Sequence, residues 1–344
     1  MISNWFWFIL DCPAFLDTLS SLILEYYCEI VMLENKLKKQ FSAVVSSHKK
    51  IGEHFYRIGL QFDGDGAFAF AKTRPGQFAQ LDLSTVSLPE VGMIPESLTD
   101  SSKRNILLRR PFSFCNVSAH ENSTNVEILY CVVGPASIRM TSLKPKDVIS
   151  IVGPLGNGFS IPEYKNKAIL LAGGMGSPPL EHLAQFLMAE HPHIEVHVFV
   201  GAKTLNNLPF EKKSDQIAQG LGFSLKEFTR YGIESKIATD DGSAGFSGPV
   251  TDCFQSWLSK TPLKKEETII YTCGPEVMLA RVADIAQKEN IDCQVSVERR
   301  MGCGIGICQS CAVECKVRDS SETVYKLCCK DGPIFDSKEV VFNI

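Results

Sequence analysis

The sequence predicts a multi-domain α+β protein: an antiparallel β-barrel, then a doubly wound α/β domain, then a small C-terminal domain built on a cysteine loop. Three observations support this order. Short β-rich runs fill residues 38–160, strand-turn-helix units follow Pro162, and seven of the 13 cysteines lie between Cys293 and Cys329. We expect the chain to divide into residues 1–35, 36–161, 162–292 and 293–344.

The composition excludes several classes of protein. The chain has 344 residues, 44% of them hydrophobic, which is enough to bury a sizeable core in two or three domains. Its net charge of -4 and its lack of a Lys/Arg block leave no basic surface for nucleic acid. Because the cysteines gather in one segment of a long chain, we expect a reducing cytoplasm and no disulfide framework.

Residues 1–35 are rich in large apolar side chains, but the sequence predicts no membrane span there. The apolar run is interrupted by Asp11, Pro13, Asp17 and Glu25. A signal peptide is not expected, because neither Lys nor Arg precedes Lys36. We expect an amphipathic extension that packs on a partner, or residues upstream of a true start at Met32.

The barrel is predicted from alternating or β-rich runs such as QFSAVVSS, EHFYRIGLQF, GQFAQLDL, RPFSFCNV and NVEILYCVV. Gly, Pro and Asp break these runs at a spacing that is typical of antiparallel strands. Between Leu83 and Leu107 the chain is rich in Ser, Pro and Glu and has little periodicity, so we expect a surface loop.

The α/β domain is predicted from two strand-turn-helix units. The first is KAILLAGGMGSPPLEHLAQFLMAE, whose helix begins at two prolines, and the strand IEVHVFVGA follows it. The second is TIIYTCGPEVMLARVADIAQKE, followed by the strand IDCQVSVE. Alternating strands and helices predict a parallel sheet that binds ligands at the carboxyl ends of its strands, where both glycine turns lie.

The cysteine loop has the spacing of a plant-type [2Fe-2S] site. Cys303, Cys308 and Cys311 form C-x4-C-x2-C, and a fourth thiol follows at Cys328 or Cys329. Glycines between the cysteines permit a tight curl and let backbone N–H groups approach the sulfurs. Structural zinc or a disulfide staple is the alternative, but zinc sites usually pair two C-x2-C units and this loop has one.

A tetrapeptide on a barrel strand is a candidate flavin site. Arg110, Pro111, Phe112 and Ser113, with Tyr130 on the next strand, could supply a cation, an aromatic wall and a hydroxyl to a flavin that bears a diphosphate. Four residues also fit an ordinary strand edge.

The two glycine turns are candidate nucleotide sites. Residues 173–176 end a strand and open a helix, so their N–H groups could bind a phosphate, although tight strand–helix packing also explains such glycines. Residues 273–276 begin with Cys273, a soft side chain that could lie against a nicotinamide ring or be an ordinary buried thiol. A nicotinamide gives two electrons and a cluster takes one, so a flavin is expected between them.

From about Met32 to its end, the chain resembles the iron-sulfur electron-transfer subunit of class 1B, NAD-dependent dihydroorotate dehydrogenase, within the ferredoxin-NADP reductase-like group. The matching segments are LLRRPFSFCNV, GPLGNGF, AGGMGSPPL, TDDGSAGFSGPVTD, YTCGPEVML, ERRMGCGIGICQSC and CKDGPIF. For FAD the resemblance implies Arg110, Pro111, Phe112, Ser113, Leu129, Tyr130, Cys131, Ala136 and Ser137. For NAD it implies Gly173, Gly174, Gly176, Cys273, Gly274, Pro275 and Glu276. For the cluster it implies Cys303, Cys308, Cys311 and Cys329, with Cys315 and Cys328 as bystanders.

One segment departs from the family. Where the family has a Tyr-Arg pair and then a Gly-Lys-Gly-Thr turn, this chain has Tyr130-Cys131 and GPAS at residues 134–137. Ser137 keeps a hydroxyl, but two positive charges expected near the diphosphate are missing.

The resemblance also implies a mechanism. Dihydroorotate is oxidised on FMN in a separate catalytic subunit, and electrons pass through the [2Fe-2S] cluster to FAD and, near Ser113 and Cys273, as hydride to NAD+. It implies a cytoplasmic heterotetramer of two plus two subunits that serves pyrimidine biosynthesis, with no substrate acid or base in this chain. One rival is the related subunit of an NADH-dependent ferredoxin:NADP oxidoreductase or sulfide dehydrogenase. The other is a non-enzymatic interaction module that holds zinc.

Overall fold

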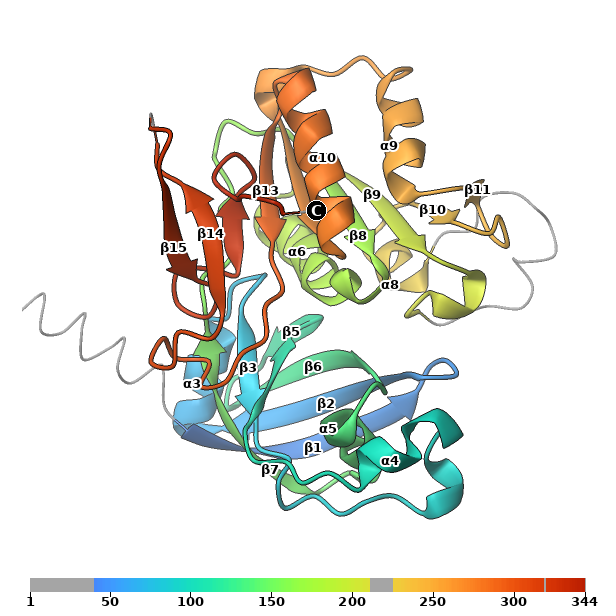
Figure 1. Cartoon of the computed structure of the whole chain (residues 1–344), viewed down its shortest axis with the longest axis vertical. Helices are drawn as coiled ribbons and strands as arrows, with labels where there is room; N and C mark the ends of the chain where they lie inside the picture. The colour runs from blue at the N-terminus through green and yellow to red at the C-terminus, as the bar shows by residue number, and fades with distance from the viewer. Residues whose placement is uncertain (1–39, 211–224, 319, 344) are drawn as a thin grey trace, which may run out of the picture. The chain divides into compact units, whose positions relative to one another are not determined.

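The computed structural model describes residues 40–210, 225–318 and 320–343 (Figure 1). The N-terminal extension predicted at residues 1–35 lies outside them. Residues 40–344 form one compact unit. Within the part of the chain that the structure describes, no helix combines the length and apolar character that a membrane crossing requires.

The first sheet is the predicted antiparallel barrel. It has seven strands in the order β4-β3-β7-β1-β2-β6-β5. The strands are β1 (Gln40–Lys50), β2 (Phe55–Asp63), β3 (Phe78–Leu81), β4 (Arg110–Ser113), β5 (Asn116–Ala119), β6 (Ser123–Cys131) and β7 (Val148–Leu155). Every neighbouring pair is antiparallel, and alternate residues of β1 such as Ala43 and Val45 are buried, as the period of two requires.

Helical segments between these strands were not predicted. Helix α3 (Gly64–Ala71) follows β2, and its Phe70 ring stacks on Phe62 with 3.8 Å between the ring centroids. The predicted surface loop contains the short turns η1 (Val91–Met93), η2 (Glu96–Leu98) and α4 (Thr99–Ser102), and α5 (Pro135–Met140) follows β6. Segments this short carry no recognisable helical period, and α3 shows only apolar residues among glycines and aspartates.

The second sheet has the order β11-β10-β9-β8-β12-β13-β16. Its strands are β8 (Lys167–Gly173), β9 (Glu195–Ala202), β10 (Ser235–Thr239), β11 (Phe246–Ser247), β12 (Thr268–Cys273), β13 (Asp292–Ser296) and β16 (Ile334–Asp336). The parallel sheet predicted for this region is confirmed for all strands except β16, which is antiparallel to β13. The short β16 comes from the cysteine-rich segment, where the sequence analysis placed no strand.

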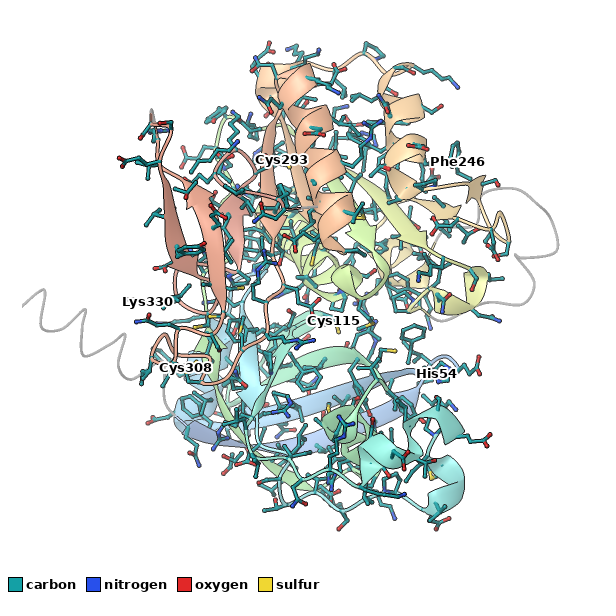
Figure 2. All side chains as sticks on the ribbon, viewed as in Figure 1. His54, Cys115, Phe246, Cys293, Cys308 and Lys330 are labelled. Atoms are coloured by element: carbon teal, nitrogen blue, oxygen red, sulfur yellow. The ribbon has the colours of Figure 1, made fainter. Side chains whose placement is uncertain are left out.

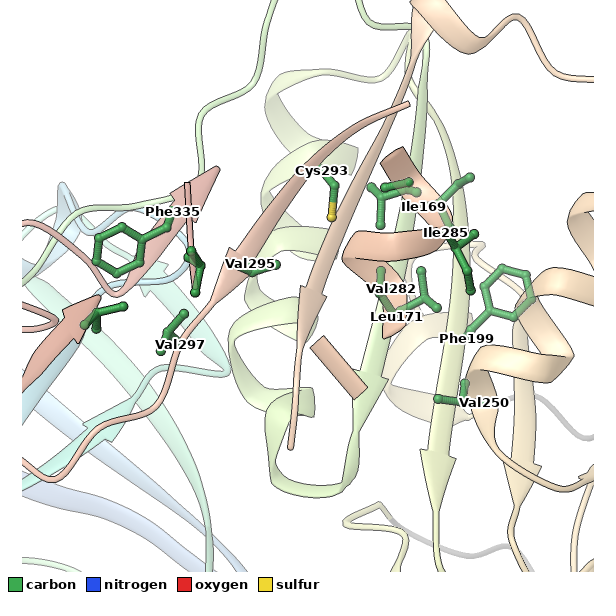
Figure 3. Packing of buried hydrophobic residues seen from close by; sticks show 14 of the residues in the cluster. Ile169, Leu171, Phe199, Val250, Val282, Ile285, Cys293, Val295, Val297 and Phe335 are labelled. Atoms are coloured by element: carbon green, nitrogen blue, oxygen red, sulfur yellow. The ribbon is translucent and has the colours of Figure 1, made fainter. Parts of the chain in front are cut away.

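Helices cover both faces of the second sheet, as a doubly wound fold requires. They are α6 (Ser177–Glu190), α8 (Lys226–Thr229), α9 (Val250–Leu258) and α10 (Glu276–Glu289), with the turns η3 (Gly174–Gly176), η4 (Leu205–Asn207) and η5 (Lys265–Glu267). Alternate residues of β8 serve the two faces. Ile169 and Leu171 pack against Val282 and Ile285 of α10 (Figure 3), whereas Leu170 packs in a separate cluster with residues of α6.

The cysteine-rich segment is an excursion from this sheet. The chain leaves it at β13, forms the cysteine loop and the hairpin β14 (Ala312–Lys316) with β15 (Thr323–Leu327), and returns as β16. Residues of the segment share a core with the α/β sheet, because Cys311, Val313 and Phe335 belong to the same buried cluster as Val295. The four domain divisions expected from the sequence stay predictions.

Candidate functional site

A cavity of about 1120 Å³ brings together residues from both sheets and from the start of the cysteine segment. Its volume suits a dinucleotide-sized ligand. All the residues implied for FAD line it, and so do those implied for NAD except Gly174. The antiparallel sheet contributes β4, β6 and α5 to the wall, and the α/β sheet contributes the turns after β8 and β12.

Strand β4 forms the part of the wall that carries the tetrapeptide Arg110–Ser113. All four residues are half-buried, and Ser113 pairs with Phe78 of β3. The Arg110 guanidinium donates through Nη1 to the carbonyl oxygens of Leu108, at 2.7 Å, and Arg109, at 3.2 Å. These bonds position the guanidinium and use only one of its nitrogens, so its other N–H groups can still bind an anion.

Two hydroxyl groups of the wall already have partners. The Tyr130 hydroxyl lies 2.9 Å from His48 Nε2, and the Tyr130 ring meets Phe112 edge-on with 6.4 Å between centroids. Burial raises the pKa of Tyr130, so this phenol stays neutral. The Ser137 hydroxyl accepts the N–H groups of Val133, at 2.9 Å, and Gly134, at 3.2 Å. Ser137 therefore caps its own turn, and Tyr130 offers the cavity its ring and backbone.

The glycine turns on the opposite wall are packed against each other. A Cβ at Gly176 would overlap the Cys273 carbonyl, and one at Gly173 would come 2.6 Å from Met278 Sδ. Close packing of the two turns is therefore one reason for these glycines, as the sequence analysis allowed. Burial raises the pKa of Cys273 to about 12, so it presents a neutral, polarisable thiol to the cavity.

Residues 296–301 also line the cavity, and the sequence analysis assigned them no role. Arg299 donates to both carboxylate oxygens of Glu276, at 3.1 and 3.0 Å. This contact links the segment that follows β13 to the turn after β12. Arg300 is exposed and forms no ion pair with any residue in the described ranges. The sequence does contain a feature that could have predicted this part of the cavity, because two adjacent arginines stand just before the first cysteine of the loop.

The cysteine loop turns its backbone N–H groups toward its sulfurs. Cys303 Sγ accepts the N–H groups of Ile307, at 3.3 Å, and Cys308, at 3.4 Å. Cys329 Sγ accepts the N–H of Gly306 at 3.1 Å. Gly304 and Gly306 have φ of 73° and 86°, the left-handed region that the curl predicted here requires. Figure 2 labels Cys308 in this loop and Lys330, which follows Cys329.

Thiolate is favoured at the rim of the loop. The Ser310 hydroxyl lies 3.1 Å from Cys308 Sγ, and this contact with backbone N–H groups lowers the pKa of Cys308 to about 6. The four sulfurs lie in two adjoining pairs, because the N–H of Cys303 reaches Cys308 Sγ at 3.4 Å and that of Cys329 reaches Cys311 Sγ at 3.4 Å. Two pairs of cysteine sulfurs beside inward N–H groups fit a core of two irons.

The two candidates for the fourth thiol differ in their hydrogen bonds. Cys328 is fully buried, and its thiol donates to the Val297 carbonyl at 3.2 Å. Cys329 faces the loop through the contacts above. Among the residues that the structure describes, no three His, Cys, Asp or Glu side chains converge as they would around a single metal ion.

Comparisons with known proteins agree with this geometry. Residues 298–341 match the model of the iron-sulfur cluster binding domain of dihydroorotate dehydrogenase B, and residues 170–284 match the oxidoreductase NAD-binding domain. Among solved structures, that of an NADH-dependent reduced ferredoxin-NADP oxidoreductase has a TM-score of 0.64 at 23% identity and covers 88% of this chain and 90% of that one. The cytochrome b5 reductase domain of Ulva prolifera nitrate reductase has a TM-score of 0.53 at 14% identity and covers 74% and 94%. These likenesses show the ferredoxin reductase-like fold.

Curated relatives cover most of the chain. A protein of Caldanaerobacter subterraneus subsp. tengcongensis is 31% identical over 306 residues, which is 89% of this chain and 100% of that protein. One of Bacillus caldolyticus is 32% identical over 299 residues, which is 86% and 96%. Both are named the electron transfer subunit of dihydroorotate dehydrogenase B (NAD(+)). With the fold, the cysteine loop and the NAD-binding match, this shows that the chain belongs to the family of dihydroorotate dehydrogenase B electron transfer subunits.

Proposed function

We propose that this chain carries electrons between a catalytic partner subunit and NAD+ through a [2Fe-2S] cluster and FAD. The observation that carries the proposal is the continuity of two sites. Residues 296–301 line the cavity, and the same segment runs directly into Cys303. A cluster in the loop would therefore lie next to a flavin in the cavity, as electron transfer between them requires.

The barrel side of the cavity would hold FAD, whose flavin can exchange hydride with a nicotinamide and single electrons with a cluster. Arg110 would bind the diphosphate with the N–H groups that its backbone contacts leave free. Phe112 would pack against the ring system, and the Ser113 hydroxyl would hydrogen-bond its polar edge. Arg300, which forms no ion pair among the described residues, would bring positive charge to the same cavity, where two charges are missing at Cys131 and residues 134–137.

The α/β side would hold NAD. The turn at Gly173–Gly176 would let backbone N–H groups approach a phosphate, and the neutral Cys273 thiol would lie beside the nicotinamide. Cys303, Cys308, Cys311 and Cys329 would hold the cluster, and the N–H groups around their sulfurs would stabilise its negative charge.

The partner would be a catalytic subunit that contains FMN and oxidises dihydroorotate, in a cytoplasmic heterotetramer of two plus two chains for pyrimidine biosynthesis. The names of the relatives support a partner, because each is called an electron transfer subunit. No residue of this chain would act as acid or base on dihydroorotate.

The test is to purify the protein without oxygen, alone and with the candidate FMN subunit, and to quantify iron, sulfide and flavin. We expect two irons, two sulfides and one FAD per chain, a visible spectrum that NADH bleaches, and dihydroorotate-dependent reduction of NAD+ in the complex. Zinc without flavin would overturn electron transfer. A complete set of cofactors that NADH reduces, with no activity on dihydroorotate in the complex, would overturn only the proposed partner.

A further inference from the structure

Gln80 is a buried amide without a hydrogen-bond partner among the residues that the structure describes. It lies on β3 and has no exposed surface. Neither its Nε2 nor its Oε1 forms a hydrogen bond with any residue in the described part of the chain. A buried carboxamide without hydrogen bonds is costly, so such a group requires an explanation, and a redox role or a bound ion or water is among those that apply.

The side chain of Gln80 lies directly against the cysteine loop. A Cβ at Gly304 would overlap Gln80 Nε2 and come 2.6 Å from Gln80 Cγ. Gly304 is itself buried, between the cysteines at 303 and 308. Any side chain at residue 304 would push the amide out of this position, so the glycine serves the contact with Gln80 as well as the turn.

The strand orients Gln80 toward the loop and away from the barrel interior. Phe78, two residues earlier on the same face of β3, belongs to one buried cluster with Cys311 and Cys329. Ala79, on the opposite face, lies next to Gly153 of β7. Gln80 also pairs with Pro111 of β4, which lines the cavity, so β3 neighbours the proposed flavin wall.

The backbone N–H groups of Ile305, Gly306 and Ile307 in the loop donate to cysteine sulfurs. This proposal rests on the [2Fe-2S] site of the proposed function: we propose that the Gln80 carboxamide N–H donates a hydrogen bond to a sulfur of the cluster. Such a bond stabilises the added electron, so Gln80 raises the reduction potential of the cluster relative to a chain without the donor.

The test is Gln80→Met, which keeps the length of the side chain and removes its N–H groups. In the holoprotein we expect the cluster to be about tenfold harder to reduce, a fall of about 59 mV for one electron, in a redox titration followed by electron paramagnetic resonance. We also expect altered g-values and faster release of iron to a chelator. Iron, sulfide and FAD contents should equal those of the wild type.

The matched control is Gln77→Met, one residue before β3. Gln77 donates to the Gly156 carbonyl at 2.8 Å and thus has a structural bond within the barrel. Its loss should lower thermal stability and leave the cluster potential unchanged. Purified wild-type protein that contains no iron would contradict the proposed function itself. A wild type with its cluster, and a Gln80→Met cluster with unchanged potential and g-values, would overturn only the role of Gln80.

Discussion

Two regions of the protein stabilise negative charge by different means. In the cysteine loop, the sulfurs of Cys303 and Cys329 receive backbone N–H groups. On α6, the fully buried carboxylate of Glu181 receives charged side chains. Arg57 of β2 bonds both of its oxygens, at 2.9 and 3.0 Å, and Arg230 adds a bond at 2.9 Å. Burial raises the pKa of Glu181, and the charges of Arg57 and Arg230 act against that shift. With guanidinium bonds on both oxygens, we expect an ionised Glu181 at neutral pH.

The difference follows from what each anion does. A guanidinium group keeps its carboxylate partner ionised, because protonation of the carboxylate would leave the positive charge of the guanidinium buried and unpaired. Backbone dipoles carry no net charge, so they tolerate a group that gains and loses an electron. The arginines suit a permanent contact between the barrel and the α/β sheet, and the N–H groups suit a redox site.

The largest effect is expected at the cluster. Cys329→Ser should abolish the cluster, because its sulfur faces the loop and receives the Gly306 N–H. Cys328→Ser should keep it, because that thiol bonds the Val297 carbonyl instead. Iron and sulfide analysis of both purified variants is the measurement. Equal loss in the two variants, or loss only in Cys328→Ser, would contradict the assignment of Cys329.

A smaller effect is expected at the ion pairs. Arg57→Met removes two bonds from the buried Glu181 carboxylate and should lower the free energy of unfolding by about 3 kcal/mol, measured by urea denaturation. The double variant Arg57→Met/Glu181→Leu should lose less than the single one, because the fully buried Glu181 carboxylate no longer stands without its Arg57 partner. A double variant that is less stable than Arg57→Met would contradict this expectation. It would show that the unpaired Glu181 charge is not the main cause of the lost stability.

The smallest effect is expected next to Glu181, at His182, which is buried with Nδ1 unpaired among the described residues. Burial lowers the pKa of His182 to about 3, below its unfolded value, so the unfolded chain binds the extra proton and stability falls as pH drops below about 6.5. At pH 5 the loss is about 2 kcal/mol. The difference in unfolding free energy between wild type and His182→Leu should change by this amount between pH 8 and pH 5. The exposed His193→Leu is the control, and an equal change there would contradict the burial effect.

The comparison also shows what the sequence could reveal. The cysteine loop is local: its spacing and glycines lie within a few residues, and the structure turns its N–H groups inward as that spacing predicts. The strands of both sheets were predictable for the same reason, since their periods are local. The cavity residues came from the family resemblance, whereas the tetrapeptide alone left an ordinary strand edge open.

Long-range contacts could not be read in this way. Arg57 and Glu181 are separated by 124 positions, and nothing near either residue signals the other. Gln80 meets Gly304 only because β3 lies beneath the loop in the folded chain. The pairing of β16 with β13 likewise depends on the chain returning to the sheet from a distant segment. Because β16 has only three residues, its sequence shows no pattern that predicts a strand.

That return makes the iron-binding segment separable in engineering terms. Ser296 of β13 sits opposite Ile334 of β16, and the N–H of Val297 bonds the Pro333 carbonyl at 2.9 Å, so the segment begins and ends at neighbouring points. Antiparallel neighbours can be joined by a two-residue turn. Residues 297–333 could therefore be exchanged between homologues as one cassette, or replaced by Asn-Gly, without cutting the parallel sheet. The cassette would carry Arg299 and Arg300 with it, so a graft would transplant part of the cavity wall together with the metal site.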